Sequence, residues 1–386
     1  EQEQPDALEQ ENRKHASYRQ SRTGEGQYIG GGGYIQRLES WLEEGQQQFL
    51  ITGESGAGKS ALIANWMQHH GQEHPSDVVY AHHLGCSNDS NVIRPLLGRM
   101  LDTASKLLKD AELITEPIQV PEDWWQLTAK VAETLLNLGR WCRNTGHRWI
   151  WVLDGLDRLT IEDQQALPWL PLFIPEGVSV MISALECPAR AIVQERQFEQ
   201  LEIGPLQRKE QEQLIENYLE RYTKKLDINR LEQILTCDLA SSPLFLRVLL
   251  EELRQCGRFE TLEAQIAAYI GPKADGSLAV NDLYARVLVR LESDCGTEPV
   301  RKALTALWAS RAGLSEMEVL DITGLAQLQW APIDLALHKA FGRHGNRLVF
   351  DHDYLRIAVQ DRYLSSEEAW REAHSDLANW FADKKD

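Results

Sequence analysis

Residues 53–60 have the types and spacing of a phosphate-binding loop. They read Gly53-Glu54-Ser55-Gly56-Ala57-Gly58-Lys59-Ser60 and fit the pattern GxxxxGK[ST] at every position. Glycines let the backbone turn its N–H groups toward phosphate oxygens, and the positive end of the following helix favours the same anion. We expect Lys59 to reach the β- and γ-phosphates, Ser60 to bind Mg²⁺, and Ala61 to line the same site. The segment predicts binding of a purine nucleoside triphosphate with Mg²⁺.

A second candidate group follows the apolar run at 149–153, which ends in Asp154. A phosphate-binding loop needs an acid on a neighbouring strand to hold the metal ion, and we assign that role to Asp154. Asp157 lies three residues further on, after the small Gly155, and is a candidate to orient or deprotonate the attacking water. A helix N-cap is the alternative role for Asp157. The NKxD motif that recognises guanine is absent, which favours ATP over GTP.

The elements around these motifs predict an α/β fold with a parallel sheet. Short β-prone runs alternate with longer helical stretches between residues 49 and 203, which is typical of parallel strands joined by helices. The expected strands are Phe49–Thr52, Val78–Leu84, Trp149–Leu153, Val178–Ser183 and Leu201–Ile203. Loops at the carboxyl ends of such strands are available for ligand.

The pattern becomes helical after Gly204-Pro205, so a new domain is expected there. A second stretch rich in helix breakers, Gly271 to Gly276, precedes a third block. In that block Ser315 and Glu318 form a capping-box pattern, and 347–350 is a lone strand after three helices, which suits a winged helix. The predicted division is an arm and linker at 1–36, a nucleotide-binding domain at 37–204, a helical domain at 205–275, and a winged-helix domain with a C-terminal helix at 276–386.

Composition narrows the classes of partner. Lys and Arg total 40 against 58 Asp and Glu, and this net charge of -18 argues against nucleic acid or an anionic membrane as a partner. No run is apolar and long enough for a membrane helix, so a soluble, cytoplasmic protein is expected. The six cysteines contain no CxxC pair, which argues against a zinc site or a disulfide framework. Tryptophans such as Trp124, Trp125 and Trp141 stand among apolar residues, so we expect them in the core.

The ordered set of motifs resembles the STAND class of signal-transduction NTPases, and its NACHT branch in particular. Beyond the two motifs above, the matching segments are Tyr28-Ile29-Gly30, Ser242–Leu246, Arg311–Glu316 and Phe350–Arg356. They are most similar to the nephrocystin and tetratricopeptide-associated NACHT proteins. The resemblance covers nearly the whole chain.

This resemblance implies a sheet of order 5-1-4-3-2 and a monomer closed over ADP. Exchange for ATP would open it, allow self-association, and serve signal transduction of the kind found in innate immunity, with sensor and effector regions outside these residues. By the same resemblance, Tyr28 and Ile29 would flank adenine, Pro243 would pack on the base or ribose, and His352 would touch the β-phosphate. Pro243 is equally suited to the first turn of a helix, and His352 to a helix start.

Three departures from the family pattern bear on activity. Gly31 stands where an arginine is frequent, Arg158 stands where an acid often follows the second Asp, and no sensor arginine follows the strand 178–183. Slow hydrolysis is therefore expected. The alternatives are a metabolic P-loop kinase, an AAA+-like motor and a winged-helix DNA binder. A kinase needs an Arg-rich lid, which does not stand out, and the other two are disfavoured by the missing arginine and the acidic charge.

Overall fold

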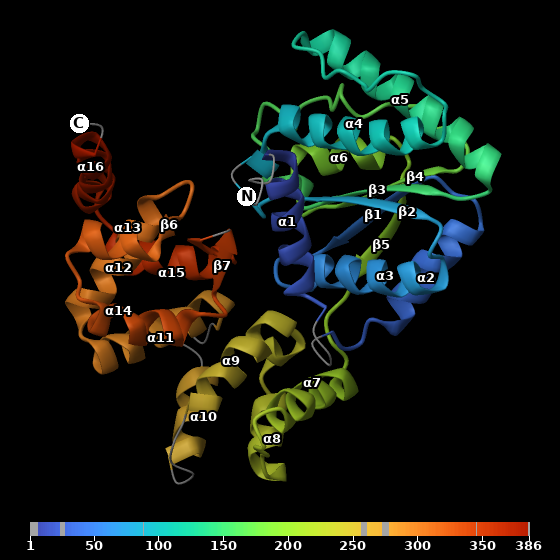
Figure 1. Ribbon diagram of the computed structural model, residues 1–386. Coiled ribbons are helices and arrows are strands. Elements are labelled where there is room, and N and C mark those ends of the chain that lie inside the picture. The colour runs from blue at the N-terminus through green and yellow to red at the C-terminus, as the bar shows by residue number, and fades with distance from the viewer. Residues whose placement is uncertain are drawn as a thin grey trace, which may run out of the picture. The chain divides into compact units, whose positions relative to one another are not determined.

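The computed structural model describes residues 7–23, 28–87, 89–255, 261–271, 278–344 and 346–384. The chain forms two compact units, residues 1–205 and residues 206–386 (Figure 1). The finer division into four domains stays a prediction, and residues 272–276 of the predicted breaker-rich stretch lie outside the described residues.

The first unit is built on a five-stranded sheet of order β2-β3-β4-β1-β5, whose paired strands are all parallel. Its strands are β1 (Gln48–Gly53), β2 (Val78–His83), β3 (Trp149–Asp154), β4 (Val178–Ser183) and β5 (Glu199–Ile203). The order confirms the expectation drawn from the family resemblance. Strands β3 and β4 are buried along their whole length, because helices cover both of their faces.

Helices lie on both faces of this sheet (Figure 1). One face is covered by α2 (Gly32–Glu43) and α3 (Lys59–Glu73), and the other by α4 (Ile93–Asp110), α5 (Trp124–Thr145) and α6 (Pro188–Glu195). The short 3-10 helices η1 (Asp89–Asn91) and η2 (Leu156–Arg158) follow β2 and β3. The apolar face of α3 is buried, since Leu62, Ile63, Trp66 and Met67 all belong to the core beside α2.

Tryptophan burial agrees only in part with the expectation. Trp141 is buried and Trp124 packs on the edge of the core formed with α4 and α5, whereas Trp125 is 71% exposed. Trp125 follows Trp124 directly at the start of α5, so the two side chains point about 100° apart around the helix axis. Placing Trp125 in the core was wrong for that reason.

The segment predicted as an arm contains helix α1 (Ala7–Gln20), which packs on α3 and β2. Sequence reasoning did not predict this helix, because the segment has few apolar positions. Its buried side chain is polar: His15 is only 2% exposed. Residues 1–6 and 24–27 lie outside the described part of the chain.

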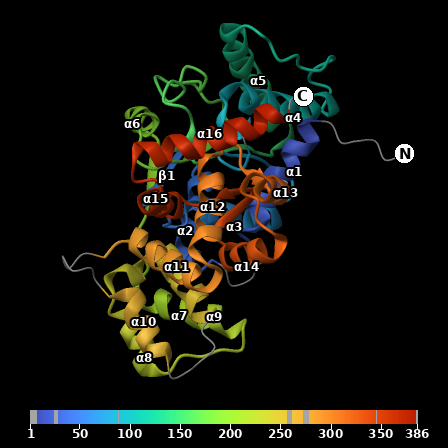
Figure 2. The same ribbon diagram turned by 90° about the vertical axis from the view of Figure 1, so that its left-hand side faces the viewer.

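The second unit consists of helices with one small antiparallel sheet. Its helices are α7 (Arg208–Glu220), α8 (Ile228–Leu235), η3 (Asp238–Ser241), α9 (Pro243–Gln255), α10 (Leu262–Ile270), α11 (Val280–Cys295), α12 (Thr297–Ala309), α13 (Glu316–Thr323), α14 (Gln327–Leu337), α15 (Asp353–Tyr363) and α16 (Glu367–Asp383). Figure 2 shows α11 and α12, which pack on each other. The predicted capping box is present, with Ser315 and Glu318 bonded to each other's backbone N–H groups.

The strand expected at 347–350 is not alone. It forms β8 (Arg347–Phe350), which pairs with β6 (Leu314–Ser315) and β7 (Phe341–His344). The prediction missed β6 because it is two residues long, and β7 because Phe341-Gly342-Arg343-His344 has no apolar alternation.

One hydrogen bond joins the beginning and the end of the first unit's sheet region. The backbone N–H of Gly204, directly after β5, donates to the hydroxyl of Tyr34 in the first turn of α2, at 3.1 Å. This bond links residues 170 positions apart. It lies next to Pro205, the last residue of the unit.

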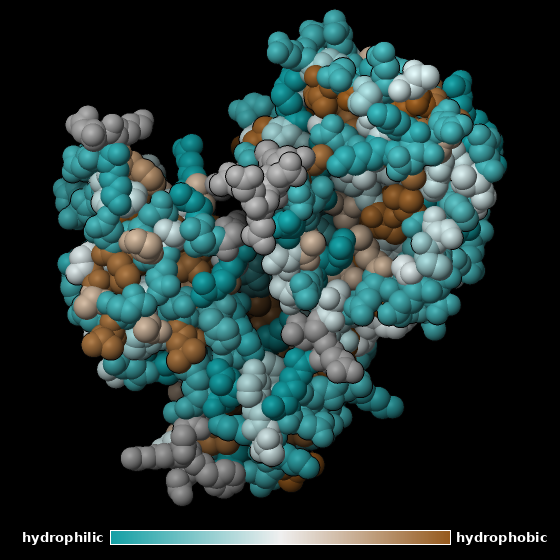
Figure 3. All heavy atoms as spheres, viewed as in Figure 1, coloured by the Kyte–Doolittle hydropathy of each residue, from teal (hydrophilic) through white to brown (hydrophobic). Residues whose placement is uncertain are grey.

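The face of the molecule drawn in Figure 3 is mainly polar. On the face shown in Figure 3, apolar residues occur in small groups separated by hydrophilic ones. Within the described ranges, no helix combines the length and the apolar character needed to cross a lipid bilayer.

Candidate functional site

The loop between β1 and α3 has the backbone conformation that a phosphate cradle requires. Gly53, Gly56 and Gly58 all have positive φ, of 142°, 78° and 101°, which side chains of L-residues rarely permit. A Cβ on Gly53 would also lie only 2.9 Å from the carbonyl oxygen of Ile203 in β5. Helix α3 begins at Lys59, so the unpaired N–H groups of its first turn adjoin the loop. Loop and helix together fit an anion.

Lys59 folds back over this loop. Its Nζ donates to the carbonyl oxygens of Gly53 at 2.8 Å and Glu54 at 2.9 Å. Partial burial lowers the pKa of Lys59, while the carboxylates of Asp157 and Asp154 act in the opposite direction. The ammonium group is thus held at the loop, with acids nearby, where a bound polyphosphate would offer stronger oxygen acceptors.

Asp154 contacts the side chains of Ser60, Ser183 and His83. It is only 1% exposed, and its Oδ1 accepts hydrogen bonds from Ser60 Oγ at 3.0 Å and from Ser183 Oγ at 2.7 Å. Its Oδ2 lies 2.9 Å from Nδ1 of His83. Burial raises the pKa of Asp154, but the contacts with His83, Ser183 and Ser60 outweigh it and leave the pKa at about 2. A buried carboxylate next to the hydroxyl of Ser60 supplies the oxygen ligands that Mg²⁺ prefers.

Asp157 also lies near this site, but its carboxylate already has a structural partner. Oδ1 of Asp157 accepts the backbone N–H of Leu185, just beyond β4, at 2.8 Å. Asp157 sits inside η2, whose N-cap is Gly155, so the alternative role as N-cap of that helix does not describe it. The carboxylate ties the loops after β3 and β4 together at the carboxyl edge of the sheet.

Tyr28 contacts the same loop. A Cβ on Gly31 would overlap its ring, and a Cβ on Gly58 would lie 3.8 Å from its Cε2 atom. The ring therefore covers the joint before α2 and approaches the end of the phosphate-binding loop, with Ile29 half-buried beside it. With Tyr28 in this position, a side chain at residue 31 would require the Tyr28 ring to move.

The two remaining candidates belong to the second unit. Pro243 is the first residue of α9, behind Ser242, whose Oγ accepts the N–H of Phe245 at 3.3 Å. His352 is the N-cap of α15 and makes no side-chain cap bond, and its Nε2 lies 3.5 Å from a carboxylate oxygen of Asp351. Both positions match the helix-start alternatives, while their nucleotide contacts stay predictions.

Sequence reasoning missed three side chains at the site. His83 and Ser183 end β2 and β4, the strands on either side of β3, and both contact Asp154. Tyr18 of α1 places its hydroxyl 3.5 Å from Ser60 Oγ and its ring 5.0 Å from that of His83. Polar residues at the carboxyl ends of strands were the available signal for the first two. Nothing in the sequence marked Tyr18.

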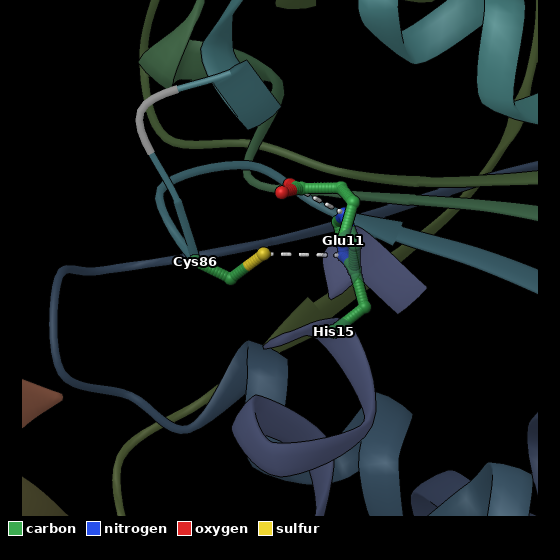
Figure 4. A group of neighbouring side chains, drawn as sticks. All are labelled: Glu11, His15 and Cys86. Carbon is green, nitrogen blue, oxygen red and sulfur yellow. Dashed lines mark hydrogen bonds and ion pairs between the residues drawn. The ribbon is translucent and has the colours of Figure 1, made fainter. Parts of the chain in front are cut away.

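Helix α1 is fastened beside His83 by a polar cluster of Glu11, His15 and Cys86 (Figure 4). Nδ1 of His15 lies 3.0 Å from the backbone nitrogen of His83, which donates to it, and 3.2 Å from Sγ of Cys86. Its Nε2 faces Glu11 at 3.5 Å. Burial lowers the pKa of His15 to about 3, so the ring is neutral. Burial raises the pKa of the Cys86 thiol to about 12. The cluster is thus a set of neutral hydrogen bonds beside one carboxylate.

Comparison with known proteins agrees with this geometry. Residues 32–181 match the model of the AAA ATPase domain family. A TPR repeat-containing protein of Dictyostelium discoideum is 26% identical over 376 residues, covering 88% of this chain and 22% of that protein. Human nephrocystin-3 is 21% identical over 349 residues, covering 86% of this chain and 24% of nephrocystin-3. The chain therefore spans about a quarter or less of the length of these relatives.

Among solved structures, the chain is similar to a STAND protein with a tetratricopeptide repeat sensor from Pyrococcus horikoshii. The TM-score is 0.51 at 15% identity, over 91% of this chain and 45% of that one. At this identity the likeness concerns the fold alone. The first unit has the fold of a P-loop NTPase, as predicted, and a helical region follows it.

Proposed function

We propose that this chain is the ATP-operated core of a STAND-class signalling switch with a NACHT-type nucleotide-binding domain. The observation that carries the proposal is the hydrogen bond of 3.0 Å from Ser60 Oγ to Asp154 Oδ1. It brings together the end of the phosphate-binding loop and an acid that lies 94 residues away in sequence. Ser60 and Asp154 would hold an Mg²⁺ ion, which would neutralise charge on the phosphates that Lys59 and the loop bind. Asp157 would act on the attacking water.

The proposed resting state is a monomer closed over ADP, and the active state an ATP-bound oligomer. Tyr28 and Ile29 would contact adenine, and Pro243 and the winged-helix-like block carrying His352 would close the site. The motif order and the TPR-containing relative support this assignment. The greater length of the relatives supports sensor and effector regions outside these residues.

Slow hydrolysis is part of the proposal. Strand β4 is followed by Ala184 and Leu185, so no arginine there stabilises charge developing on the transferred phosphate. One carboxylate oxygen of Asp157 also accepts the N–H of Leu185, and this bond reduces the ability of Asp157 to take a proton from water. A slow chemical step gives each nucleotide state the lifetime that a switch needs.

The test is to denature the purified protein, identify the released nucleotide, and measure the particle size before and after exchange into a non-hydrolysable ATP analogue with Mg²⁺. We expect ADP from a monomer, and a larger particle after exchange. Rapid multiple-turnover ATPase activity without a change in size would instead support the alternatives, a metabolic P-loop kinase or an AAA+-like motor.

A further inference from the structure

A second polar cluster lies at the other end of α3, away from the phosphate-binding loop. Glu39 of α2 and His70 and His74 of α3 and its C-cap each offer one ligand atom, and these three atoms lie within 4.8 Å of one another. His70 is fully buried, and Nδ1 of its ring lies 2.9 Å from Oε2 of Glu39. Nothing in the proposed nucleotide chemistry uses these residues.

Both ring nitrogens of His70 face carboxylates. Nδ1 faces Glu39, and Nε2 lies 3.3 Å from Oδ2 of Asp77. A neutral imidazole carries one N–H and so satisfies only one of the two acids. The other nitrogen then presents a lone pair to a carboxylate, which is repulsive unless a cation lies between them. Either a second proton on the ring or a metal ion supplies that cation.

Two atoms of the cluster lack hydrogen-bond partners. Nε2 of His70 and Oε1 of Glu39 are buried without one. Leaving such atoms unsatisfied destabilises the folded protein, and more so when they are charged. The pKa of Glu39 stays below its usual value: burial raises it, but the hydrogen bond from His70 and the nearby His69 and His74 rings outweigh burial. Glu39 is thus an ionised carboxylate among histidines.

From this geometry we propose that Glu39, His70 and His74 bind a divalent transition-metal ion, with Zn²⁺ as the natural occupant. Two imidazoles and one carboxylate form a known ligand set for zinc, and nitrogen ligands disfavour Mg²⁺ and Ca²⁺. Ligand atoms around tetrahedral zinc are separated by about 3.3 Å, given bonds of about 2.0 Å. The 2.9 Å between His70 Nδ1 and Glu39 Oε2 requires only a small opening.

Asp77 provides the second hydrogen-bonding partner that a metal-binding histidine usually has on its other ring nitrogen. Asp77 faces the far nitrogen of His70, which is where a carboxylate orients a ligating imidazole and raises its basicity. Asp77 is itself held, because its Oδ1 accepts the backbone N–H of Arg148 at 2.8 Å. His74 is half-buried, which leaves an approach from solvent for the ion.

The Glu11–His15–Cys86 cluster resembles a metal site by residue type, but its bonds argue against one. Nδ1 of His15 already accepts the N–H of His83, and the Cys86 thiol is protonated. This cluster therefore serves as an internal alternative that the experiment must separate from the Glu39 site.

The experiment uses the full chain after chelation and dialysis, titrated with Co²⁺ as a spectroscopic substitute for Zn²⁺ in the absence of nucleotide. We expect one equivalent to give visible absorption of tetrahedral type without a thiolate charge-transfer band, and Zn²⁺ to displace it. Trp66 stacks on His70 with ring centroids 5.2 Å apart, so its fluorescence should be quenched, and Trp66→Phe should remove that part of the change.

Variants locate the ion. His74→Ala and Glu39→Gln should abolish the Co²⁺ spectrum, and Asp77→Asn should weaken binding by roughly 10- to 100-fold. The matched control is His69→Ala, which removes an exposed histidine 3.7 Å from Glu39 that is outside the ligand set, and it should bind as the parent does. Circular dichroism checks that each variant is folded.

Three results would overturn the proposal. One is the absence of a Co²⁺ spectrum in the folded parent. Another is a spectrum that survives His74→Ala but disappears in Cys86→Ser, which would place the ion at the other cluster. A third is an NMR spectrum of His70 with protons on both ring nitrogens that zinc does not change, which would make the cluster an ion pair. None of these results bears on nucleotide binding.

Discussion

Nδ1 of His83 lies 2.9 Å from Oδ2 of Asp154, and neither side chain is exposed by more than 1%. The two residues are direct partners in the register of β2 and β3, so the sheet itself aligns them. His83 thereby leaves the opposite oxygen of Asp154 to Ser60 and Ser183. It acts on the predicted metal site by orienting the acid.

We therefore predict that His83→Ala weakens Mg²⁺-dependent nucleotide binding by roughly 10- to 100-fold, as loss of an orienting partner typically does. Nucleotide affinity without Mg²⁺ should stay at the parent level. His83→Asn, whose amide can donate to Asp154, should recover part of the loss. The measurement is ADP and ATP affinity at several Mg²⁺ concentrations. Equal losses with and without Mg²⁺ would mean that His83 supports the fold alone.

Lys59→Ala should remove nucleotide binding or weaken it severely, because the cation facing the β- and γ-phosphates is lost. The protein should stay folded, since the two bonds of Lys59 end on carbonyl oxygens of its own loop. Calorimetric titration with ATP and Mg²⁺ measures the effect. A folded variant with parent affinity would disprove the assignment of the loop.

Asp157→Asn separates chemistry from structure at the edge of the sheet. Asparagine keeps an oxygen for the N–H of Leu185 but cannot take a proton from water. We expect unchanged nucleotide affinity and slower single-turnover hydrolysis of ATP. If hydrolysis proceeds at the parent rate, the carboxylate only joins the two loops.

Acid should loosen the attachment of α1. The folded-state pKa of His15 is about 3, below the ordinary 6.5, because of burial first, with the charge of Arg99 acting in the same direction. At a pH between these two pKa values, His15 is protonated in the unfolded chain and neutral in the folded chain. This stabilising contribution is therefore complete above pH 6.5 and is lost as the pH falls toward 3.

The comparison is urea unfolding of the parent and His15→Asn at pH 6.5 and pH 5. The parent should lose about 1.6 kcal/mol more than the variant over that interval, because the slope approaches about 1.4 kcal/mol per pH unit only below the ordinary value of 6.5. Burial and then the neighbouring His15 ring lower the pKa of His82, so the difference between the two profiles reports His15 together with its effect on His82. Parallel pH profiles would refute the assignment to His15.

His352→Leu tests whether the second unit takes part in holding nucleotide. A hydrogen bond from His352 to a charged phosphate in the ADP state alone is worth about 1.5–3 kcal/mol, so its loss should speed ADP release by roughly 10- to 150-fold. His338→Leu is the matched control, since that histidine bonds the backbone of its own unit at Leu335 O. The ADP off-rate and particle size are measured for both. Equal off-rates would refute the contact.

The sheet was predictable because its strands are apolar runs bounded by polar or glycine residues, so the expected and observed limits of β4 coincide and those of β3 differ by one residue. The phosphate-binding loop and Asp154 were predictable because their chemistry demands fixed residue types at fixed spacing. These local signals do not depend on the rest of the chain.

The contacts of α1 were not predictable, because its burial depends on polar partners on β2 and in the following loop and not on an apolar face of its own. The pairing of His83 with Asp154 needed the register of two strands about 70 residues apart, which periodicity does not specify. Residues 70 and 74 carried the spacing of neighbours on one helix face, but Glu39 comes from a different helix.

The bond between Tyr34 and Gly204 has a mechanical consequence. The chain enters the sheet region near Tyr34 and leaves it at Gly204. The segment that enters and the segment that leaves are therefore joined by one hydroxyl. Tension applied to the chain beyond Pro205 acts on this bond before it reaches the ladder of β5. Loss of the bond would also free the first turn of α2, in which Tyr34 lies. The start of α2 and the segment after β5 are thus held by the same phenol hydroxyl, and one broken bond would release both.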